Sequence, residues 1–474
     1  MLIERFIANY ARKKNESYLQ FAPSASITIP RRSGDIPTLL YIHVPFCEEL
    51  CPYCSFNRVT FQEGLARSYF AALRKEIIMY KELGYDFKAL YVGGGTPTVL
   101  IDELEETINL TRQKFNIIEV SVETNPNHLT PDNIEMLKKM GVNRLSVGVQ
   151  TFDDGLLKTI ERYHKYGSGQ EIAERLQYTQ GNFQTLNVDM IFNFPTQTME
   201  ILEKDLSTLI GLKVDQVTYY PLMVSSFTRD IMNNKLGIVD YDRGKDFYQK
   251  ITEMFSLQYK TSTAWCFSRN DRMADSRNPA RGNLAGVQAP VGEVISMQGM
   301  REGEAGYPLA GGALPGEGAT QAPVIDEYVV NYEEYAGLGS GSFGYLGGSA
   351  YANTFDIRAY IERINEGLLP VAAKKAFSMK ERLCYDLLMK LFGLSLDIEQ
   401  LSAKHSVNIY RYLWPEILFF RLIGGLEKHG NLLTLTKKGQ YYWVLMMREF
   451  FIGVNNFRDY CRAEGRLKAD GEKQ

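Results

Sequence analysis

Three cysteines stand close together in the segment YIHVPFCEELCPYCSFN, which covers residues 41–57. Cys47, Cys51 and Cys54 follow the spacing C-x3-C-x2-C, so one short loop can bring their thiolates to a single metal centre. A structural zinc site normally has four nitrogen or sulfur ligands, and a 4Fe-4S cluster is normally held by four thiolates. Three cysteines would therefore leave one iron of a cluster open to a substrate or cosubstrate.

Other uses of these cysteines stay open at this point. A disulfide within the loop would leave one cysteine over and would need an oxidising compartment. Cys51 and Cys54 also form a C-x-x-C pair of the kind that redox proteins use, although this interpretation ignores Cys47. Zinc is a further candidate. The spacing favours the cluster over each of these.

A glycine-rich segment, YVGGGTP, lies at residues 91–97, one strand–helix unit after the cysteines. Gly93, Gly94 and Gly95 would let the backbone approach a ligand closely, and Thr96 adds a hydroxyl group. A run of glycines after a strand is also typical of an ordinary tight turn. Its position after the cysteine motif favours the binding interpretation.

With these two motifs the chain resembles the radical S-adenosylmethionine (SAM) enzymes. More narrowly, it is similar to the branch that contains oxygen-independent coproporphyrinogen III oxidase, the related haem chaperone and the anaerobic haem-degrading enzymes. The resemblance covers most of residues 38–260 and, more weakly, 325–450. It implies a 4Fe-4S cluster on Cys47, Cys51 and Cys54, with SAM chelating the open iron. The implied activity is that of a radical SAM oxidoreductase, like coproporphyrinogen dehydrogenase, acting on a tetrapyrrole.

The resemblance also implies a pocket for SAM. Its residues, matched through the surrounding motifs, are Tyr41, Tyr53, Gly94, Gly95, Thr96, Glu123, Gln150, Arg162 and Asp189. Glu123 in SVETNP corresponds to a glutamate near the methionyl or ribose part of SAM. Gln150 and Arg162 correspond to residues that hold the ribose and the carboxylate. Asp189 in NVDMIF corresponds to an aspartate on the ribose side, and Tyr53 to a residue that contacts adenine.

The substrate is less clearly indicated than the cofactors. Coproporphyrinogen III oxidases extend the motif to C-x3-C-x2-C-x-C, whereas Phe56 stands at the last position here. The haem chaperone branch shares a phenylalanine at that position. The segments TYYPLMV and AWCFSR look closer to the haem-degrading relatives. Oxidation, degradation and carriage of a tetrapyrrole therefore stay open as alternatives.

The elements that must position these residues alternate regularly between strand and helix. From Leu39 onward, about six short apolar strands are each followed by a helical segment. Such alternation predicts a parallel sheet covered by helices, here an α/β fold with a partial β/α barrel, in which active sites lie at the carboxyl ends of the strands. The cysteines, the glycine motif and acids such as Glu123 and Asp189 all fall near strand ends, so we expect one common rim.

Six segments are predicted along the chain: an N-terminal arm that packs on the barrel (1–37), the radical SAM β/α barrel (38–265), a flexible insertion rich in Gly, Ala and Pro (270–323), a glycine-rich connecting segment (325–376), a small winged-helix-like α+β domain (377–450) and a tail (451–474). The insertion has too little apolar surface to order itself. The resemblance implies that the glycines of GLGSGSFGYLGG approach a bound substrate. The tail is charged, and we expect it to be frayed after Arg462.

Composition is that of an ordinary globular protein. The chain has 474 residues, of which 45% are hydrophobic, and a formal net charge of −3. This length predicts more than one unit, and the absence of a basic excess argues against nucleic-acid binding. No apolar run predicts a transmembrane segment or a signal peptide, so we expect a cytoplasmic protein. The resemblance implies a low-potential electron donor such as flavodoxin or ferredoxin.

Overall fold

The structure, a computed structural model, describes residues 2–19, 22–23, 29–32, 38–272, 332 and 334–471. Apart from its first three residues, the predicted insertion at 270–323 lies outside the described residues. Among the described helices, none combines the length and the apolar character that a membrane crossing requires.

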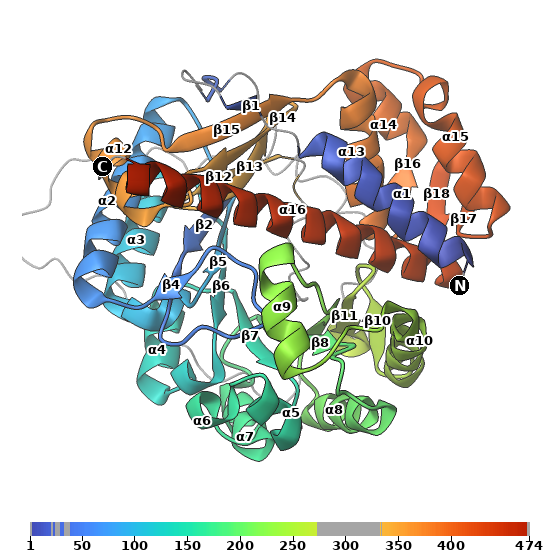
Figure 1. Ribbon diagram of the computed structural model, residues 1–474, viewed down its shortest axis with the longest axis horizontal. Coiled ribbons are helices and arrows are strands. Elements are labelled where there is room, and N and C mark those ends of the chain that lie inside the picture. The colour runs from blue at the N-terminus through green and yellow to red at the C-terminus, as the bar shows by residue number, and fades with distance from the viewer. Residues whose placement is uncertain are drawn as a thin grey trace, which may run out of the picture.

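A run of parallel strands forms the centre of the molecule (Figure 1). In spatial order these strands are β12 (Glu334–Leu338), β2 (Thr38–Val44), β5 (Ala89–Gly94), β6 (Glu119–Thr124), β7 (Arg144–Gln150), β8 (Thr185–Phe192) and β9 (Gln216–Pro221). Each pairs in parallel with the next. The strands from β2 to β9 also follow one another along the chain, which confirms the predicted succession of about six units.

Antiparallel strands extend this sheet at both edges. On one side β9 is followed by β11 (Cys266–Arg269) and β10 (Tyr259–Thr261), and on the other β12 is followed by β13 (Phe343–Leu346), β14 (Ser349–Asn353), β15 (Val371–Ala376) and β1 (Ala22–Pro23). No hydrogen bonds between described residues join the two edges, so the predicted partial barrel is an open, mixed sheet. A separate pair, β3 (Phe46–Cys47) and β4 (Val59–Thr60), frames the cysteine loop.

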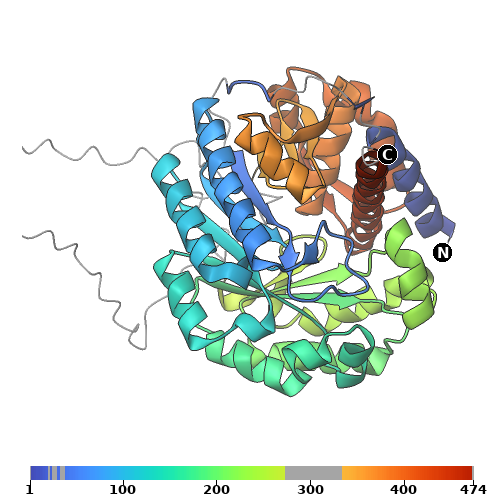
Figure 2. The same ribbon diagram turned by 60° about the vertical axis from the view of Figure 1, so that its left-hand side comes forward.

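Helices cover the outer face of the parallel strands (Figures 1 and 2). They are α2 (Glu63–Glu82), α3 (Ile101–Lys114), α4 (Pro131–Lys139), α5 (Asp154–Thr159), α6 (Tyr163–Tyr166), α7 (Gly169–Thr179) and α8 (Met199–Leu212), with α9 (Ser226–Lys235) and α10 (Gly244–Phe255) after β9. Local signals set their starts. The Thr130 hydroxyl caps α4 by accepting from the Asn133 amide at 3.3 Å, and Pro131 occupies the first turn.

The C-terminal unit has the element order of a winged helix. It comprises α13 (Met379–Phe392), β16 (Ser395–Asp397), α14 (Ile398–His405), α15 (Ile409–Leu422), β17 (Leu426–His429), β18 (Leu432–Leu435) and the start of α16 (Lys437–Gly471). The three strands form an antiparallel sheet in the order β16-β18-β17, and the hairpin of the last two is the expected wing.

The last helix corrects the prediction for the tail. We expected the chain to fray after Arg462, but α16 continues without interruption to Gly471. It runs from the winged-helix unit across to the strands that extend the sheet (Figure 1). The N-terminal helix α1 (Leu2–Tyr18) lies along it, with Arg12 paired to Glu449 at 3.0 Å. From α1, Arg5 also pairs with Asp242 at 2.5 Å, near the start of α10.

Candidate active site

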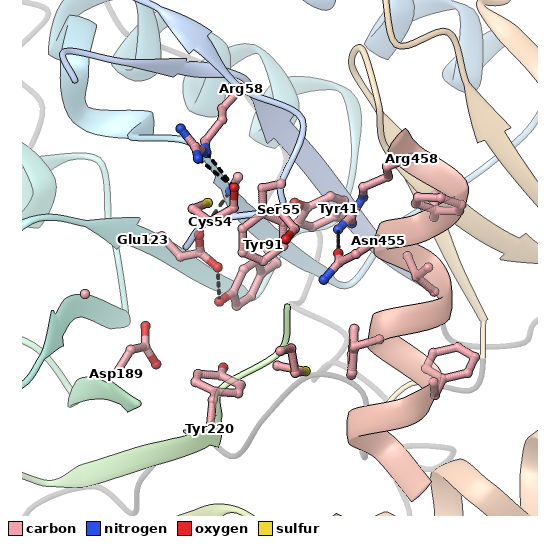
Figure 3. Close-up of a pocket in the computed structure, with 18 of the residues that line it drawn as sticks. Tyr41, Cys54, Ser55, Arg58, Tyr91, Glu123, Asp189, Tyr220, Asn455 and Arg458 are labelled. Atoms are coloured by element: carbon pink, nitrogen blue, oxygen red, sulfur yellow. Dashed lines mark hydrogen bonds between the residues drawn. The ribbon is translucent and has the colours of Figure 1, made fainter. Parts of the chain in front are cut away.

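A cavity of about 420 Å³ lies at the carboxyl ends of the parallel strands (Figure 3). Its volume is in the range of small-molecule sites. The three motif cysteines line it, together with Tyr41, Tyr53, Gly94, Gly95, Glu123, Gln150, Arg162 and Asp189. Of the residues predicted for the SAM pocket, Thr96 alone is not among those that line the cavity. Its buried hydroxyl is 3.8 Å from the Cys47 sulfur and accepts a hydrogen bond from Asn125 at 2.8 Å.

The cysteine loop is shaped by an arginine that the sequence reasoning missed. The Arg58 guanidinium donates to the carbonyl oxygen of Cys51 at 2.5 Å and to that of Cys54 at 2.6 and 3.2 Å. Cys47 is buried, whereas Cys51 and Cys54 are half-buried beside an apolar cluster that includes Phe194. Because one charged guanidinium bonds to both carbonyl groups, it fixes the curvature of the loop. The three cysteines line the cavity.

The three thiols have the arrangement that a cluster needs. They are free and line one cavity, and the cysteines of a 4Fe-4S cluster each bind a different iron. Burial raises the pKa of Cys47 to about 11, so this residue would release a proton on binding metal.

The glycine motif brings the end of β5 against the strand that leads to the cysteines. Gly94 has a φ of 115°, and a Cβ atom there would lie 2.6 Å from the His43 ring. A Cβ atom at Gly95 would lie 2.6 Å from the Phe46 carbonyl oxygen, and the Gly95 amide donates to the Val44 carbonyl at 2.7 Å. The glycines are therefore required first by protein packing. Gly94 and Gly95 also line the cavity.

Two half-buried acids lie on the cavity wall, Glu123 on β6 and Asp189 on β8. Glu123 accepts hydrogen bonds from the Tyr91 hydroxyl at 2.8 Å and from the Gly94 amide at 3.0 Å, as Figure 3 shows for the tyrosine. Asp189 accepts from the Ser146 hydroxyl at 2.7 Å. Burial raises the pKa of Glu123 to about 6 and also raises that of Asp189. Acids held in this way can accept hydrogen bonds from a cationic or hydroxyl-bearing ligand.

Arg162 places a positive charge next to the cysteine loop. Its guanidinium lies 3.5 Å from the Cys51 sulfur and 3.3 Å from the Tyr53 hydroxyl, and it donates to the Gly148 carbonyl at 2.5 Å. It also stacks 4.1 Å from the centre of the Tyr166 ring. Its buried Nε has no hydrogen-bond partner among the described residues. The spare Nε donor of Arg162 is available to a ligand.

Gln150 stands at an irregularity in the sheet. The pairing of β7 with β8 shifts register between Gly148 and Gln150, and Gln150 has a positive φ of 77°. Positive φ is uncommon for residues other than glycine, and such strain is concentrated at functional sites. The bulge re-aims the end of β7, where Gln150 lines the cavity.

Asn57 ties the cysteine loop to three other segments. Its carbonyl oxygen accepts from His43 Nε2 at 2.7 Å, its amide nitrogen donates to the Ser340 carbonyl at 3.1 Å, and its Oδ1 accepts from Arg462 of α16 at 3.3 Å. Because a carbonyl only accepts, His43 carries its proton on Nε2, and its Nδ1 accepts from the Tyr41 hydroxyl at 2.9 Å. Burial lowers the pKa of His43 to about 3, so the ring is neutral.

The glycine-rich segment after β12 contacts protein more than the cavity. A Cβ atom at Gly339 would lie 2.4 Å from the Tyr69 hydroxyl, and one at Gly341 would lie 2.3 Å from the Asn57 side chain. Gly344 does line the cavity. The close approaches of Gly339 and Gly341, which we expected toward a substrate, are thus made toward other groups of the protein.

The sequence reasoning also missed the wall opposite the cysteines. C-terminal segments supply it, chiefly with aromatic side chains, and its members include Tyr335, Phe343, Tyr345, Tyr385, Leu388, Phe450, Phe451, Val454, Asn455 and Arg458. The signal available in the sequence was the helical spacing of apolar residues, which continues past residue 450 through Val454 and Phe457. Tyr220 lines the cavity as well, whereas Tyr219 is buried in the core.

The geometry of the sheet and its cysteine loop defines an α/β protein of the radical SAM type. Residues 41–209 match the model of the Radical SAM superfamily, and the chain carries a radical SAM domain. Proteins of this superfamily use a 4Fe-4S cluster and SAM. The three free thiols suit a 4Fe-4S cluster. Gly94, Gly95 and the spare donor of Arg162, which line the same cavity, suit SAM.

Curated relatives narrow the comparison. The "Heme chaperone HemW" of Bacillus subtilis (strain 168) is 29% identical over 344 residues, which are 70% of this chain and 76% of the relative. The "Oxygen-independent coproporphyrinogen III oxidase" of Pseudomonas aeruginosa is 23% identical over 435 residues, which are 86% of this chain and 84% of the relative. Among solved structures, coproporphyrinogen III oxidase (HemN) from Escherichia coli aligns with a TM-score of 0.66 at 19% identity, over 92% of this chain and 98% of that one. At this identity the alignment shows the fold.

Proposed function

We propose that this chain is a radical SAM enzyme that acts on a tetrapyrrole, in the manner of an oxygen-independent coproporphyrinogen III oxidase. One observation carries the proposal: a single cavity has the cysteine loop and the predicted SAM residues on one side and a wall of aromatic rings on the other. Both kinds of named relative concern haem or its precursors, which supports the substrate class.

The residues on the first side have separate tasks. Cys47, Cys51 and Cys54 would hold the cluster, which when bound supplies the electron that cleaves SAM. Arg58 fixes the backbone of the loop, and Arg162 holds a positive charge at the Cys51 sulfur.

The acids and glycines on the same side would orient SAM. Glu123 of β6 and Asp189 of β8, the strands on either side of β7, would present carboxylate oxygens to its amino or ribose groups. Gly94 and Gly95 keep the end of β5 free of side chains beside Cys47. Rigid strands and short hydrogen bonds hold this set in place before any ligand arrives, which is the arrangement that catalysis requires.

The second side has the character expected of a site for a flat apolar ring system. Tyr345 and Tyr385 have ring centroids 4.5 Å apart, and Phe343 lies 6.0 Å from Phe355. Aromatic side chains offer large apolar faces together with polar edges. These rings lie outside residues 41–209, the part that matches the Radical SAM superfamily. We therefore assign them to substrate binding and not to the binding of the cofactors.

A haem chaperone is the second candidate function. The similarity to HemW of Bacillus subtilis over 70% of the chain favours it, as does Phe56 at the position where the oxidases place a further cysteine. A degrading methyltransferase is a third outcome within the same substrate class. Turnover separates these candidates, because a chaperone would release the tetrapyrrole chemically unchanged.

The test is an anaerobic reaction analysed by mass spectrometry. Protein reconstituted with iron and sulfide is mixed with SAM, a reductant and either coproporphyrinogen III or haem, and the C47A/C51A/C54A variant is the control. Loss of carboxyl carbon from coproporphyrinogen would establish the oxidase, and a methylated, ring-opened product from haem would establish the degrading enzyme. Bound haem with no SAM-dependent product would favour the chaperone. Binding of neither tetrapyrrole would refute the proposal.

A further inference from the structure

Two polar side chains stand within the aromatic wall, both on α16. Arg458 donates from Nη1 to Oδ1 of Asn455 at 2.7 Å. Its guanidinium lies 5.0 Å from the centre of the Phe56 ring and 5.2 Å from that of Phe343. Both residues line the cavity and are more than nine-tenths buried. Figure 3 shows them projecting from the helix toward Tyr41.

This pair presents N–H donors to the cavity. Arginine keeps its charge at all working pH values, and its planar group matches the two oxygens of a carboxylate. Since Oδ1 of Asn455 accepts from Arg458, the amide nitrogen is directed away from the guanidinium, and Figure 3 shows it on the cavity side. A ligand oxygen placed there would meet a neutral and a charged donor side by side.

The other arginines of the cavity have different positions. The Arg58 donors described above go to the carbonyl groups of the cysteine loop, and those of Arg162 lie around Cys51. Among the described residues that line the aromatic wall, Arg458 is an arginine, and Lys390 of α13 is a second cation. The rings around Arg458 lower the local polarity, so that a charge-assisted hydrogen bond at this point is stronger than it would be in water.

We propose that Arg458, with Asn455, binds a carboxylate group at the edge of the substrate ring while the aromatic side chains hold its face. The proposal rests on the proposed function, since the carboxylate would belong to an acidic side chain of a tetrapyrrole. A macrocycle anchored in this way lies beside α16, in the cavity that the cysteine loop also lines. Its position relative to the predicted SAM site is then set by the helix.

The experiment compares a ligand with and without free carboxylates. Haem and its dimethyl ester are titrated into the wild-type chain and into Arg458→Gln, and binding is followed by absorbance. We expect Arg458→Gln to weaken the binding of haem by about 10- to 100-fold, the loss of one hydrogen bond to a charged group, and to leave the ester unchanged. Asn455→Asp keeps the size of the side chain but adds a negative charge, so it should weaken the binding of haem and spare the ester in the same way.

Two controls separate the causes. Lys390→Gln removes the other cation of the wall, and Arg421→Gln removes an exposed arginine of α15. The proposal is overturned if haem and its ester respond equally to Arg458→Gln and Asn455→Asp, or if the discrimination moves instead with Lys390→Gln. If Arg458→Gln does not fold, the Asn455→Asp titration decides. Failure of the wild-type chain to bind either ligand would refute the proposed function itself.

Discussion

Replacing Asn57 by alanine should loosen the cysteine loop and destabilise the chain. The Asn57 side chain is buried and joins four segments. Its amide donates to the Ser340 carbonyl at 3.1 Å, lies 3.4 Å from the Phe355 carbonyl, and its Oδ1 accepts from Arg462 at 3.3 Å. The variant removes these bonds and leaves at least one buried carbonyl without its donor.

The magnitude follows from the bonds lost. A hydrogen bond contributes about 1 kcal/mol, and a buried polar group left without a partner costs about 1–3 kcal/mol. Two well-formed bonds and one abandoned carbonyl give a loss of about 3–5 kcal/mol in the free energy of unfolding. That is a large fraction of the stability of an ordinary domain. Urea denaturation of the metal-free protein measures it.

Two further variants test the reasoning. Asn116→Ala removes an exposed asparagine that bonds to Asp86, and its effect should stay within about 0.5 kcal/mol. Asn57→Asp keeps the shape of the side chain but sets a carboxylate oxygen against two carbonyls, so it should destabilise at least as much as alanine. Amide hydrogen exchange over residues 47–60 should quicken in both Asn57 variants. A loss below about 1 kcal/mol with unchanged exchange in this segment would refute the role given to Asn57.

Three other variants test the site and its support. Arg58→Gln removes the donors that shape the cysteine loop, so reconstituted protein should hold less iron and sulfide than wild type, with Arg58→Lys in between; equal contents would contradict this role. Gly95→Ala places a Cβ atom 2.6 Å from the Phe46 carbonyl oxygen and should lower the free energy of unfolding by about 1–3 kcal/mol; an unchanged melting temperature would show that the loop relaxes. Burial raises the pKa of Glu76 to about 7, above its value in the unfolded chain, so its contribution to stability is present at acid pH and is lost as the pH rises toward 7. Denaturation of Glu76→Gln between pH 4.5 and 8 should show a smaller loss with pH, and parallel curves would contradict the shift.

The side of the cavity that carries the cysteines was predictable as a place where these residues meet, because its signals are local. Cys47, Cys51 and Cys54 lie within one loop, and the glycines and Glu123 stand at strand ends that the alternation of apolar segments marks. Parallel strands bring their carboxyl ends to one edge. Residues that are far apart in sequence therefore meet without any information about side-chain contacts.

The aromatic side of the cavity was not predictable for the opposite reason. Asn57 and Arg462 are 405 positions apart, and their contact depends on how α16 crosses the molecule. The charged composition after residue 456 resembles a solvated tail, and helical spacing alone does not say which face will be covered. Arg58 was overlooked because an arginine after a loop is usually solvated, and its acceptors are backbone carbonyls that no motif records.

One helix thus supports both sides of the cavity. Arg462 donates to the Phe56 carbonyl in the cysteine loop, and Asn456 and Asp459 accept from the first amides of α9 at 2.8 and 3.1 Å. On the same stretch of α16, Asn455 and Arg458 face the aromatic wall. A ligand that shifts this stretch must therefore strain the hydrogen bonds of the cysteine loop as well. By the reciprocity of linked binding equilibria, a ligand that orders the loop and a ligand bound at the proposed Arg458 site should then change each other's affinity.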